Sequence, residues 1–147
     1  LIVTKNIATR LRPAILDKLG LIPAIEWLVE DQERKSGVSI YLAIQSSPGV
    51  YDNSVSIACF RICQEALTNA MKHAKASELT VSLEEQEEFL LLSIDDNGVG
   101  MDMDNQGKPF SLGILGMKER AELINGVLDI NSKPGSGTKI QLKVPVK

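Results

Sequence analysis

The sequence is poor in the residues that mark membrane spans, disulfide scaffolds and metal cages. Aromatic residues make up 4% of the chain, which has two cysteines and one histidine. No apolar run reaches the roughly 20 residues that cross a bilayer, and no signal peptide is visible. The net charge of −3 leaves no basic surface of the kind that binds nucleic acid. These absences exclude a membrane span or a disulfide framework within this sequence, and nucleic-acid binding by this domain.

The two cysteines, Cys59 and Cys63, lie one helical turn apart on the apolar side of a predicted helix. No third or fourth metal ligand stands nearby, so we interpret them as small buried residues. Free buried thiols are compatible with a reducing cytoplasm.

The chain does have enough apolar residues for one globular domain. Of its 147 residues, 44% are hydrophobic and 24% are charged, a balance typical of a folded domain with a real core. The first residue is Leu rather than Met, so we expect a fragment of a longer protein, in which a membrane sensor segment could lie upstream.

The sequence predicts a helix with two different faces, which begins near residues 52–54, all favoured N-cap types, and ends at about residue 73 or 74. The apolar face consists of Cys59, Cys63, Ala66, Leu67, Ala70 and Ala74. The opposite face carries Arg61, Glu65, Asn69 and Lys72. Two interpretations of the polar face stay open. It is either a solvated surface with a favourable Glu–Lys spacing, or a metal–phosphate face.

In the second interpretation three of these four side chains have a chemical role. Asn69 supplies an amide oxygen to Mg²⁺, which takes few protein ligands. Lys72 supplies a point charge for phosphate oxygens. Glu65 polarises a hydroxyl or a water, or orders the shell of the metal.

The loop at residues 95–100, DDNGVG, directly follows a predicted buried strand over 89–94. Gly98 and Gly100 permit positive φ and a close approach of a ligand to the backbone. Asp96 could accept a hydrogen bond from an exocyclic amine such as that of adenine. Asp-Asn-Gly is also common turn chemistry. Even so, the loop strengthens the metal–phosphate interpretation of the helix.

Residues 100–111 have no apolar period and predict a loop that leads to a helix. Gly113 and Gly116 are expected at the entrance of this helix, where backbone N–H groups and the helix dipole can receive phosphate. The predicted apolar stripe of the helix is Leu115, Ala121, Leu123 and Ile124, and the predicted stop is Asn125-Gly126. Lys118 and Arg120 are either solvated charges, or one of them neutralises phosphate or meets a partner.

The remaining elements follow from simple periodicity. A short helical turn precedes a helix over 23–35 with Ile25, Leu28 and Val29 facing the core and Trp27 packing to one side. A strand over 38–44 is followed, after the helix, by an antiparallel hairpin whose charged turn is 84–88. A last hairpin joins strands at 127–130 and 138–144.

Four motifs thus occur in order: QEALTNAMKHAKA, DDNGVG, SLGILGMKERAELI and PGSGTKIQLKVP. Their order and spacing resemble the catalytic, ATP-binding domain of sensor histidine kinases, with the nitrate-sensor-like subgroup as the best match. That domain belongs to the superfamily shared with gyrase, a heat-shock chaperone and the MutL mismatch-repair proteins. The family often has a glycine where Ser111 stands and a different residue at Leu112, whereas Gly113 and Gly116 match.

The resemblance implies an α+β fold of the Bergerat type. We expect a two-layer α/β sandwich with a mixed, mostly antiparallel sheet of about five strands, covered on one face by about three helices. ATP and Mg²⁺ are the implied ligands, with Asn69 on the metal and Glu65 as the catalytic residue. The implied nucleotide-binding residues are Asn69, Lys72, His73, Asp96, Gly98, Gly100, Gly113, Gly116 and Thr138.

Two of these residues have ordinary alternatives. His73, the only histidine, stands inside the Asn-containing motif and lacks the acidic neighbour typical of a phosphoacceptor, so we expect a phosphate-proximal or structural role. Thr138 matches the GxGT motif, whose Thr lies near the adenine pocket, but it could also be a plain β-branched strand residue.

The implied function is transfer of the γ-phosphoryl group of ATP to a histidine on a dimerisation helix that this sequence lacks. Residues 1–20 are the expected connector to that helix and residues 21–147 the ATPase domain; an LRP…EWL run typical of the subgroup begins at Leu11 and ends at Leu28. The implied partners are the dimerisation/phosphoacceptor domain of the same homodimeric kinase and a downstream response regulator. The domain is expected in the cytoplasm, and an inner-membrane anchor elsewhere in the full-length protein stays open.

Three other functions remain as alternatives. An anti-sigma-factor-type serine kinase shares the ATP site, although the LRP…EWL run argues against it. An ATP-gated clamp of the gyrase or MutL type continues into a transducer domain, whereas this sequence stops after its last strand. The third alternative is a nucleotide-binding module without turnover.

Overall fold

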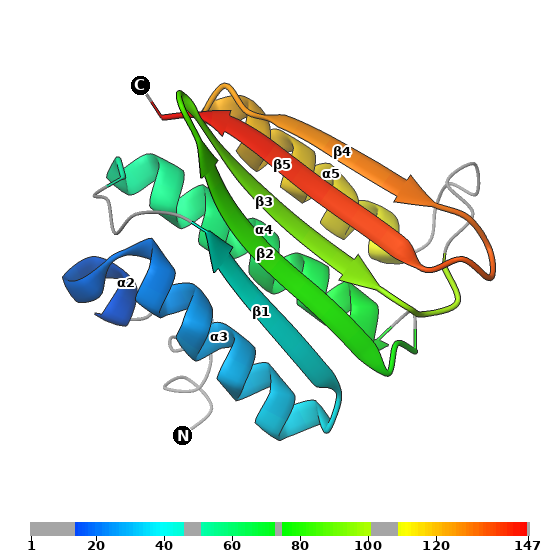
Figure 1. Cartoon of the computed structure of the whole chain (residues 1–147). Helices are drawn as coiled ribbons and strands as arrows, with labels where there is room; N and C mark the ends of the chain where they lie inside the picture. Colours follow the sequence, from blue (N-terminus) through cyan, green and yellow to red (C-terminus); the bar gives the residue numbers. More distant parts are fainter. Residues whose placement is uncertain (1–13, 46–50, 73–74, 101–108, 147) are drawn as a thin grey trace, which may run out of the picture.

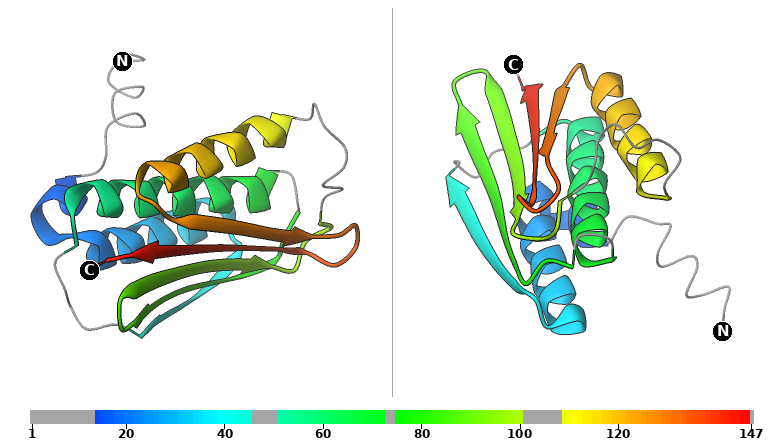
Figure 2. Two further views of the ribbon diagram at one scale, coloured as in Figure 1. Left: turned by 90° about the horizontal axis from the view of Figure 1, so that it is seen from above. Right: turned by 90° about the vertical axis from the view of Figure 1, so that its right-hand side faces the viewer.

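The structure, a computed structural model, forms two layers. It describes residues 14–45, 51–72, 75–100 and 109–146, and of residues 109–112 the backbone alone. The elements are α2 (Ala14–Leu19), α3 (Leu21–Ser36), β1 (Ser39–Gln45), α4 (Asn53–Lys72), β2 (Glu78–Gln86), β3 (Phe89–Asp96), α5 (Pro109–Leu123), β4 (Val127–Ser132) and β5 (Thr138–Pro145). One face of the sheet is covered by α3, α4 and α5, and no helix of the described residues covers the other face (Figure 1, Figure 2). This confirms the predicted α+β sandwich.

The five strands lie in the order β1-β2-β3-β5-β4. The pair β1–β2 is parallel and the other three pairs are antiparallel, as predicted for a mixed, mostly antiparallel sheet. Alternate residues of the central strands face the helices and are buried, among them Leu79, Val81 and Leu83 of β2 and Leu90, Leu92 and Ile94 of β3. The residues between them point to the uncovered face, where Ser82 pairs with Ser93. The sheet therefore has one core, on its helical side.

Helix α4 is the central helix of the covering layer and lies between α3 and α5 (Figure 1). Its bounds agree with the prediction to within a residue or two. The predicted apolar face is buried at Cys59, Cys63, Ala66, Leu67 and Ala70, while Ala74 lies outside the described residues. Burial raises the pKa of both thiols to about 12, which keeps them protonated and unreactive at neutral pH.

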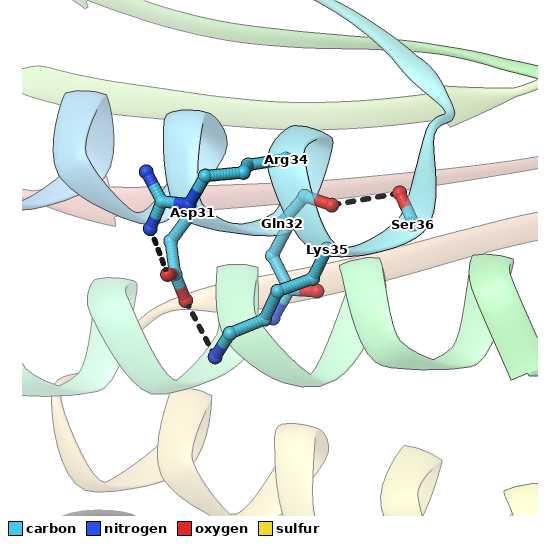
Figure 3. Close-up of polar contacts among 5 residues, drawn as sticks. All are labelled: Asp31, Gln32, Arg34, Lys35 and Ser36. Atoms are coloured by element: carbon cyan, nitrogen blue, oxygen red, sulfur yellow. Dashed lines mark hydrogen bonds and ion pairs between the residues drawn. The ribbon is translucent and has the colours of Figure 1, made fainter.

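Helix α3 packs beside α4 through Ile25, Leu28 and Val29, all buried as predicted. Trp27 does not pack as predicted, because 40% of its surface is exposed. Asp31 is buried, and its two carboxylate oxygens meet Arg34 at 2.7 Å and Lys35 at 3.0 Å (Figure 3). These contacts offset the cost of removing the carboxylate from water.

The edge strand β1 is fastened to the same helix. The Glu33 carboxylate accepts a hydrogen bond of 2.9 Å from the backbone N–H of Ile40. This contact satisfies a donor that an edge strand would otherwise expose. Leu16 of the short helix α2 is also buried in the common core. The boundary between a connector at 1–20 and a domain at 21–147 stays a prediction.

Two element boundaries differ from the prediction. The charged turn at 84–88 is shorter, because β2 continues to Gln86 by pairing Glu84 with Leu91 and Glu85 with Leu90. Helix α5 begins at Pro109, several residues before the expected start, and Pro is favoured in the first turn of a helix.

The apolar stripe of α5 also differs. Its buried residues are Ile114, Met117 and Ala121, with Ile124 just after the helix, whereas Leu115 and Leu123 are exposed. The predicted stripe mixed residues from two faces of the helix. Among the described helices, none combines the length and apolarity that a bilayer span requires.

Candidate functional site

Asp96 and Thr138 form one end of the candidate site. Asp96 is the last residue of β3 and Thr138 the first of β5, and the two stand directly opposite each other in the antiparallel register. Both are buried, with exposed fractions of 9% and 5%. The Thr138 hydroxyl lies 2.7 Å from the hydroxyl of Ser132 on β4. The sheet therefore brings together the two residues assigned to adenine by resemblance, from positions far apart in sequence.

The carboxyl group of Asp96 is a poorly solvated hydrogen-bond acceptor. Burial raises its pKa, and the neighbouring Asp95 adds to the rise, while backbone N–H groups of Gly98 and Thr138 oppose it. The Gly98 N–H donates to Oδ1 at 2.8 Å. An amine that donated a hydrogen bond to this carboxylate would compensate for part of the lost solvation.

Gly100 and Gly137 let two loops pack backbone against backbone. Both have positive φ, of 73° and 74°. A Cβ at Gly100 would collide with the carbonyl of Lys133, and one at Gly137 with the carbonyl of Asp96. The prediction of positive φ is confirmed at Gly100, but the close neighbour that the structure shows is the β4–β5 turn. The prediction is wrong for Gly98, which does not have positive φ and contributes its N–H to Asp96.

Asn97 is a positioning residue that the sequence reasoning missed. Its Oδ1 accepts hydrogen bonds from the backbone N–H groups of Ser77 and Glu78, at 2.9 Å and 3.0 Å. Its Nδ2 donates to the Ser77 hydroxyl at 3.0 Å, and its own N–H donates to the Glu78 carbonyl. These bonds hold the loop after β3 to the segment that joins α4 to β2. The available signal was Asn inside an Asp-Asn-Gly turn, which side-chain amides often stabilise.

Asn69 is the most informative residue of the polar face of α4. It is 6% exposed, and among the described residues its Nδ2 is the buried side-chain atom without a hydrogen-bond partner. A buried N–H₂ donor left unpaired costs stability, and a ligand oxygen such as that of a phosphate could accept from it, while Oδ1 of the same side chain is the atom that could bind a metal. No cluster of three or more His, Cys, Asp or Glu side chains in the described part of the chain could hold a metal alone. An amide that shares Mg²⁺ with phosphates fits this donor set.

Glu65 lies one turn before Asn69 and contacts helix α5. A Cβ at Gly113 would collide with the Glu65 carboxylate, so glycine makes room for it there. Glu65, Gly113 and Gly116 all line a groove of about 640 Å³ between α4 and α5. The other lining residues are Ile57, Arg61, Gln64, Met117 and Arg120.

The two glycines are brought to Glu65, but not in the expected way. Both lie inside α5 rather than at its entrance, because the helix begins at Pro109. Backbone N–H groups within a helix are engaged with carbonyls four residues back, so they are less available to phosphate than those of the first turn. Their contact with nucleotide stays a prediction.

The remaining charges divide into those in the groove and those outside it. Arg120 lines the groove, and the exposed Lys118 does not line it. Lys72 ends α4 and is exposed. His73 lies outside the described residues, as does most of the expected lid at 100–111.

Comparison with known proteins gives one consistent result. Residues 54–147 match the family described as histidine kinase-, DNA gyrase B- and HSP90-like ATPases. The chain is 36% identical over 142 residues to the oxygen sensor histidine kinase NreB of Staphylococcus carnosus. It is 40% identical over 140 residues to the signal transduction histidine-protein kinase/phosphatase DegS of Bacillus subtilis. These matches cover 97% and 92% of this chain, but only 41% and 36% of the relatives.

Solved structures show the same fold at lower sequence identity. The histidine kinase AdeS of Acinetobacter baumannii superposes with a TM-score of 0.69 at 19% identity, over 91% of this chain and 73% of that one. The histidine kinase domain of the blue-light activated kinase EL346 of Erythrobacter litoralis gives a TM-score of 0.66 at 19% identity, over 84% of this chain and 60% of that one.

Replacing Asp96 by Asn should stabilise the nucleotide-free protein at pH 7. The pKa of Asp96 is higher in the folded than in the unfolded chain, so its contribution to stability is present at low pH and lost as the pH rises through the folded value. Asn keeps an oxygen for the Gly98 N–H and carries no charge. We expect the midpoint temperature of thermal unfolding, followed by circular dichroism, to rise by about 2–4 °C at pH 7. The gain should shrink as the pH falls toward the ordinary Asp value of about 3.9.

A matched control is Asp129→Asn, on the exposed face of β4, which should give no such pH-dependent gain. A wild type that is more stable than Asp96→Asn at pH 7 would contradict the cost that we assign to burying this charged carboxylate.

The glycines of α5 offer a second comparison. Alanine in place of a glycine inside a helix stabilises by about 0.5–1 kcal/mol. No atom lies within 4 Å of a Cβ at Gly116, so Gly116→Ala should show this gain in denaturant unfolding. Gly113→Ala should gain less or lose stability, because Glu65 must move. The gain should return in the double variant Gly113→Ala/Glu65→Ala, and equal gains for the two single variants would refute the contact.

Proposed function

The chain belongs to the family of histidine kinase-, DNA gyrase B- and HSP90-like ATPases, and on this basis we propose that it is the ATP-binding catalytic domain of a two-component sensor histidine kinase. The observation that carries the proposal is the unpartnered, buried amide nitrogen of Asn69, one turn from Glu65 on the helix bordering the groove, because a phosphate oxygen could accept its hydrogen bond while its Oδ1 binds Mg²⁺. A buried polar atom without a partner is costly in a protein that does not use it. The named relatives NreB and DegS, both histidine kinases, favour this function over the serine kinase and the ATP-gated clamp.

ATP would bind with its base at the end of the sheet. The Asp96 carboxylate would accept a hydrogen bond from the adenine amine. Thr138 would contact the base next to Asp96, in part through water. Gly98 and Gly100 keep this wall free of side chains. Because the Asp96 carboxyl is poorly solvated, a donor from the ligand is worth more there than in water.

The phosphates would run along α4 toward Glu65. Asn69 would hold Mg²⁺ through its Oδ1, and the ion would supply positive charge to offset the charge that develops on the transferring group. Lys72 and His73 offset phosphate charge, and Gly113 and Gly116 keep the α5 side open. Glu65 orients or activates the attacking group, a role that requires it to face the groove.

The attacking group would be an imidazole of a dimerisation/phosphoacceptor domain in the same full-length kinase, which we expect to be a homodimer. The one histidine of this sequence, His73, stands within the Asn-containing motif rather than in an acceptor segment. A response regulator would receive the phosphoryl group afterwards. We place the domain in the cytoplasm.

Two substitutions separate binding from transfer. Asn69→Ala should weaken Mg²⁺-dependent ATP binding at least about tenfold, as expected when a metal-orienting group is lost. Glu65→Gln should keep ATP binding within about twofold and slow transfer to a supplied dimerisation domain about 100-fold. Isothermal titration measures the first, and transfer of radiolabelled phosphate the second.

The wild-type chain alone should bind ATP without phosphorylating itself. Acid-labile phosphohistidine on the isolated chain would overturn the assignment of the acceptor. If Asn69→Ala bound ATP as tightly as wild type, with and without Mg²⁺, the role of Asn69 on which the proposed function rests would be wrong.

A further inference from the structure

The groove between α4 and α5 contains a pair of arginines that the proposed ATP chemistry does not use. Arg61 comes from α4 and Arg120 from α5, so each wall of the groove supplies one guanidinium group. Arg61 donates a hydrogen bond to Gln64 Oε1 at 3.0 Å, and this is not its only interaction. Within the described residues Arg120 makes no ion pair.

The order of residues along α4 separates these arginines from the nucleotide. Asn69, Glu65, Arg61 and Ile57 follow one another at four-residue steps, about 6 Å each along the helix axis. The loop that carries Asp96 is fastened by Asn97 to the segment that follows the C-terminal end of α4. If the base lies at Asp96 and the metal at Asn69, as the proposed function holds, Arg61 lies beyond Glu65. This is the side from which the acceptor must approach.

The charge of the groove favours the binding of an acidic segment. The residues that line the groove include two arginines and one carboxylate, that of Glu65, in a protein whose net charge is −3. The planar guanidinium fork binds a carboxylate through two parallel hydrogen bonds, which fixes orientation as well as position. Gly113 and Gly116 add no side chains to the α5 wall, and Ile57 and Met117 add apolar surface. The groove can therefore admit a helix side that carries a carboxylate among apolar residues.

We propose that Arg61 and Arg120 form a carboxylate clamp that recognises an acidic side chain of the segment presenting the acceptor imidazole. The clamp holds that segment so that its imidazole meets the Glu65 end of the groove. Both arginines are positioning residues for the acceptor and do not contact the nucleotide. The inference rests on the proposed function, because it needs a separate acceptor segment.

Substitution of either arginine should weaken binding of the acceptor domain and leave the affinity for ATP unchanged. We expect Arg120→Ala and Arg61→Gln each to raise the acceptor-domain concentration for half-maximal transfer about tenfold, the effect of losing one partner of a charge-assisted pair. Affinity for Mg²⁺-ATP should stay within about twofold of wild type. Lys118→Ala, from the same helix but outside the groove, is the matched control and should leave both quantities unchanged.

The probe is the dimerisation domain of the full-length kinase, used as wild type and with each of its acidic residues near the acceptor histidine changed to the amide. One of these amide variants should reproduce the Arg120→Ala defect and should add no further defect to it. Arg120→Lys should restore only part of the affinity, because Lys lacks the fork. Circular dichroism of each variant reports whether the fold is retained.

Three results are decisive. If ATP affinity falls together with transfer, the arginines bind phosphate and the clamp is wrong. If neither quantity changes in Arg120→Ala or Arg61→Gln, the groove does not receive the acceptor. If the wild-type chain binds ATP but transfers to no acceptor domain, the proposed function itself fails, and the clamp fails with it.

Discussion

The hydrogen bonds of the Asn97 side chain are the contact on which the geometry of the site depends. They join the loop after β3 to the segment between α4 and β2, and so fix the position of Asp96 relative to the C-terminal end of α4. The β3–β5 register places Thr138 against Asp96 from the other side. The backbone of Gly137 also packs closely against the carbonyl of Asp96. One carboxylate is thus held by three segments that are distant in sequence.

The structure concentrates its unfavourable polar burial at two places. Asp96 has a raised pKa, and Asn69 has an amide nitrogen without a partner. Elsewhere buried polar groups are compensated, as the two ion pairs of Asp31 and the hydroxyl contact between Ser132 and Thr138 illustrate. Native proteins tolerate such costs where a ligand offsets them. The same two residues are those that the proposed function assigns to adenine and to magnesium.

Much of the fold could be predicted from the sequence because its periodic signals are strong. The alternation of Leu79, Val81 and Leu83 and the apolar face of α4 both correspond to buried surfaces. The start of α5 was predicted too late, because the glycines at 113 and 116 indicate a helix entrance locally, whereas the helix begins at Pro109. Leu115 and Leu123 were misassigned because a helix with apolar residues on several sides has no unique stripe.

Within the site, the sequence identified the chemically distinctive residues and missed those that position them. Asp96, Asn69 and Glu65 stand out by residue type and motif, whereas Asn97 looked like turn chemistry. The value of Gly100 lies in its contact with the turn at Lys133, which no local pattern reveals. Arg61 and Arg120 come from helices that meet only in the folded chain, so their common groove is visible only in three dimensions.

The central claim is that the two ends of one nucleotide bind to the loop after β3 and to the side of α4. The most direct measurement is a crystal structure of the chain with Mg²⁺ and a non-hydrolysable ATP analogue. The account predicts the adenine amine against the Asp96 carboxylate and the metal against the Asn69 amide in the same bound molecule. An analogue whose base lies in the α4–α5 groove, or whose metal has no contact with Asn69, would contradict it.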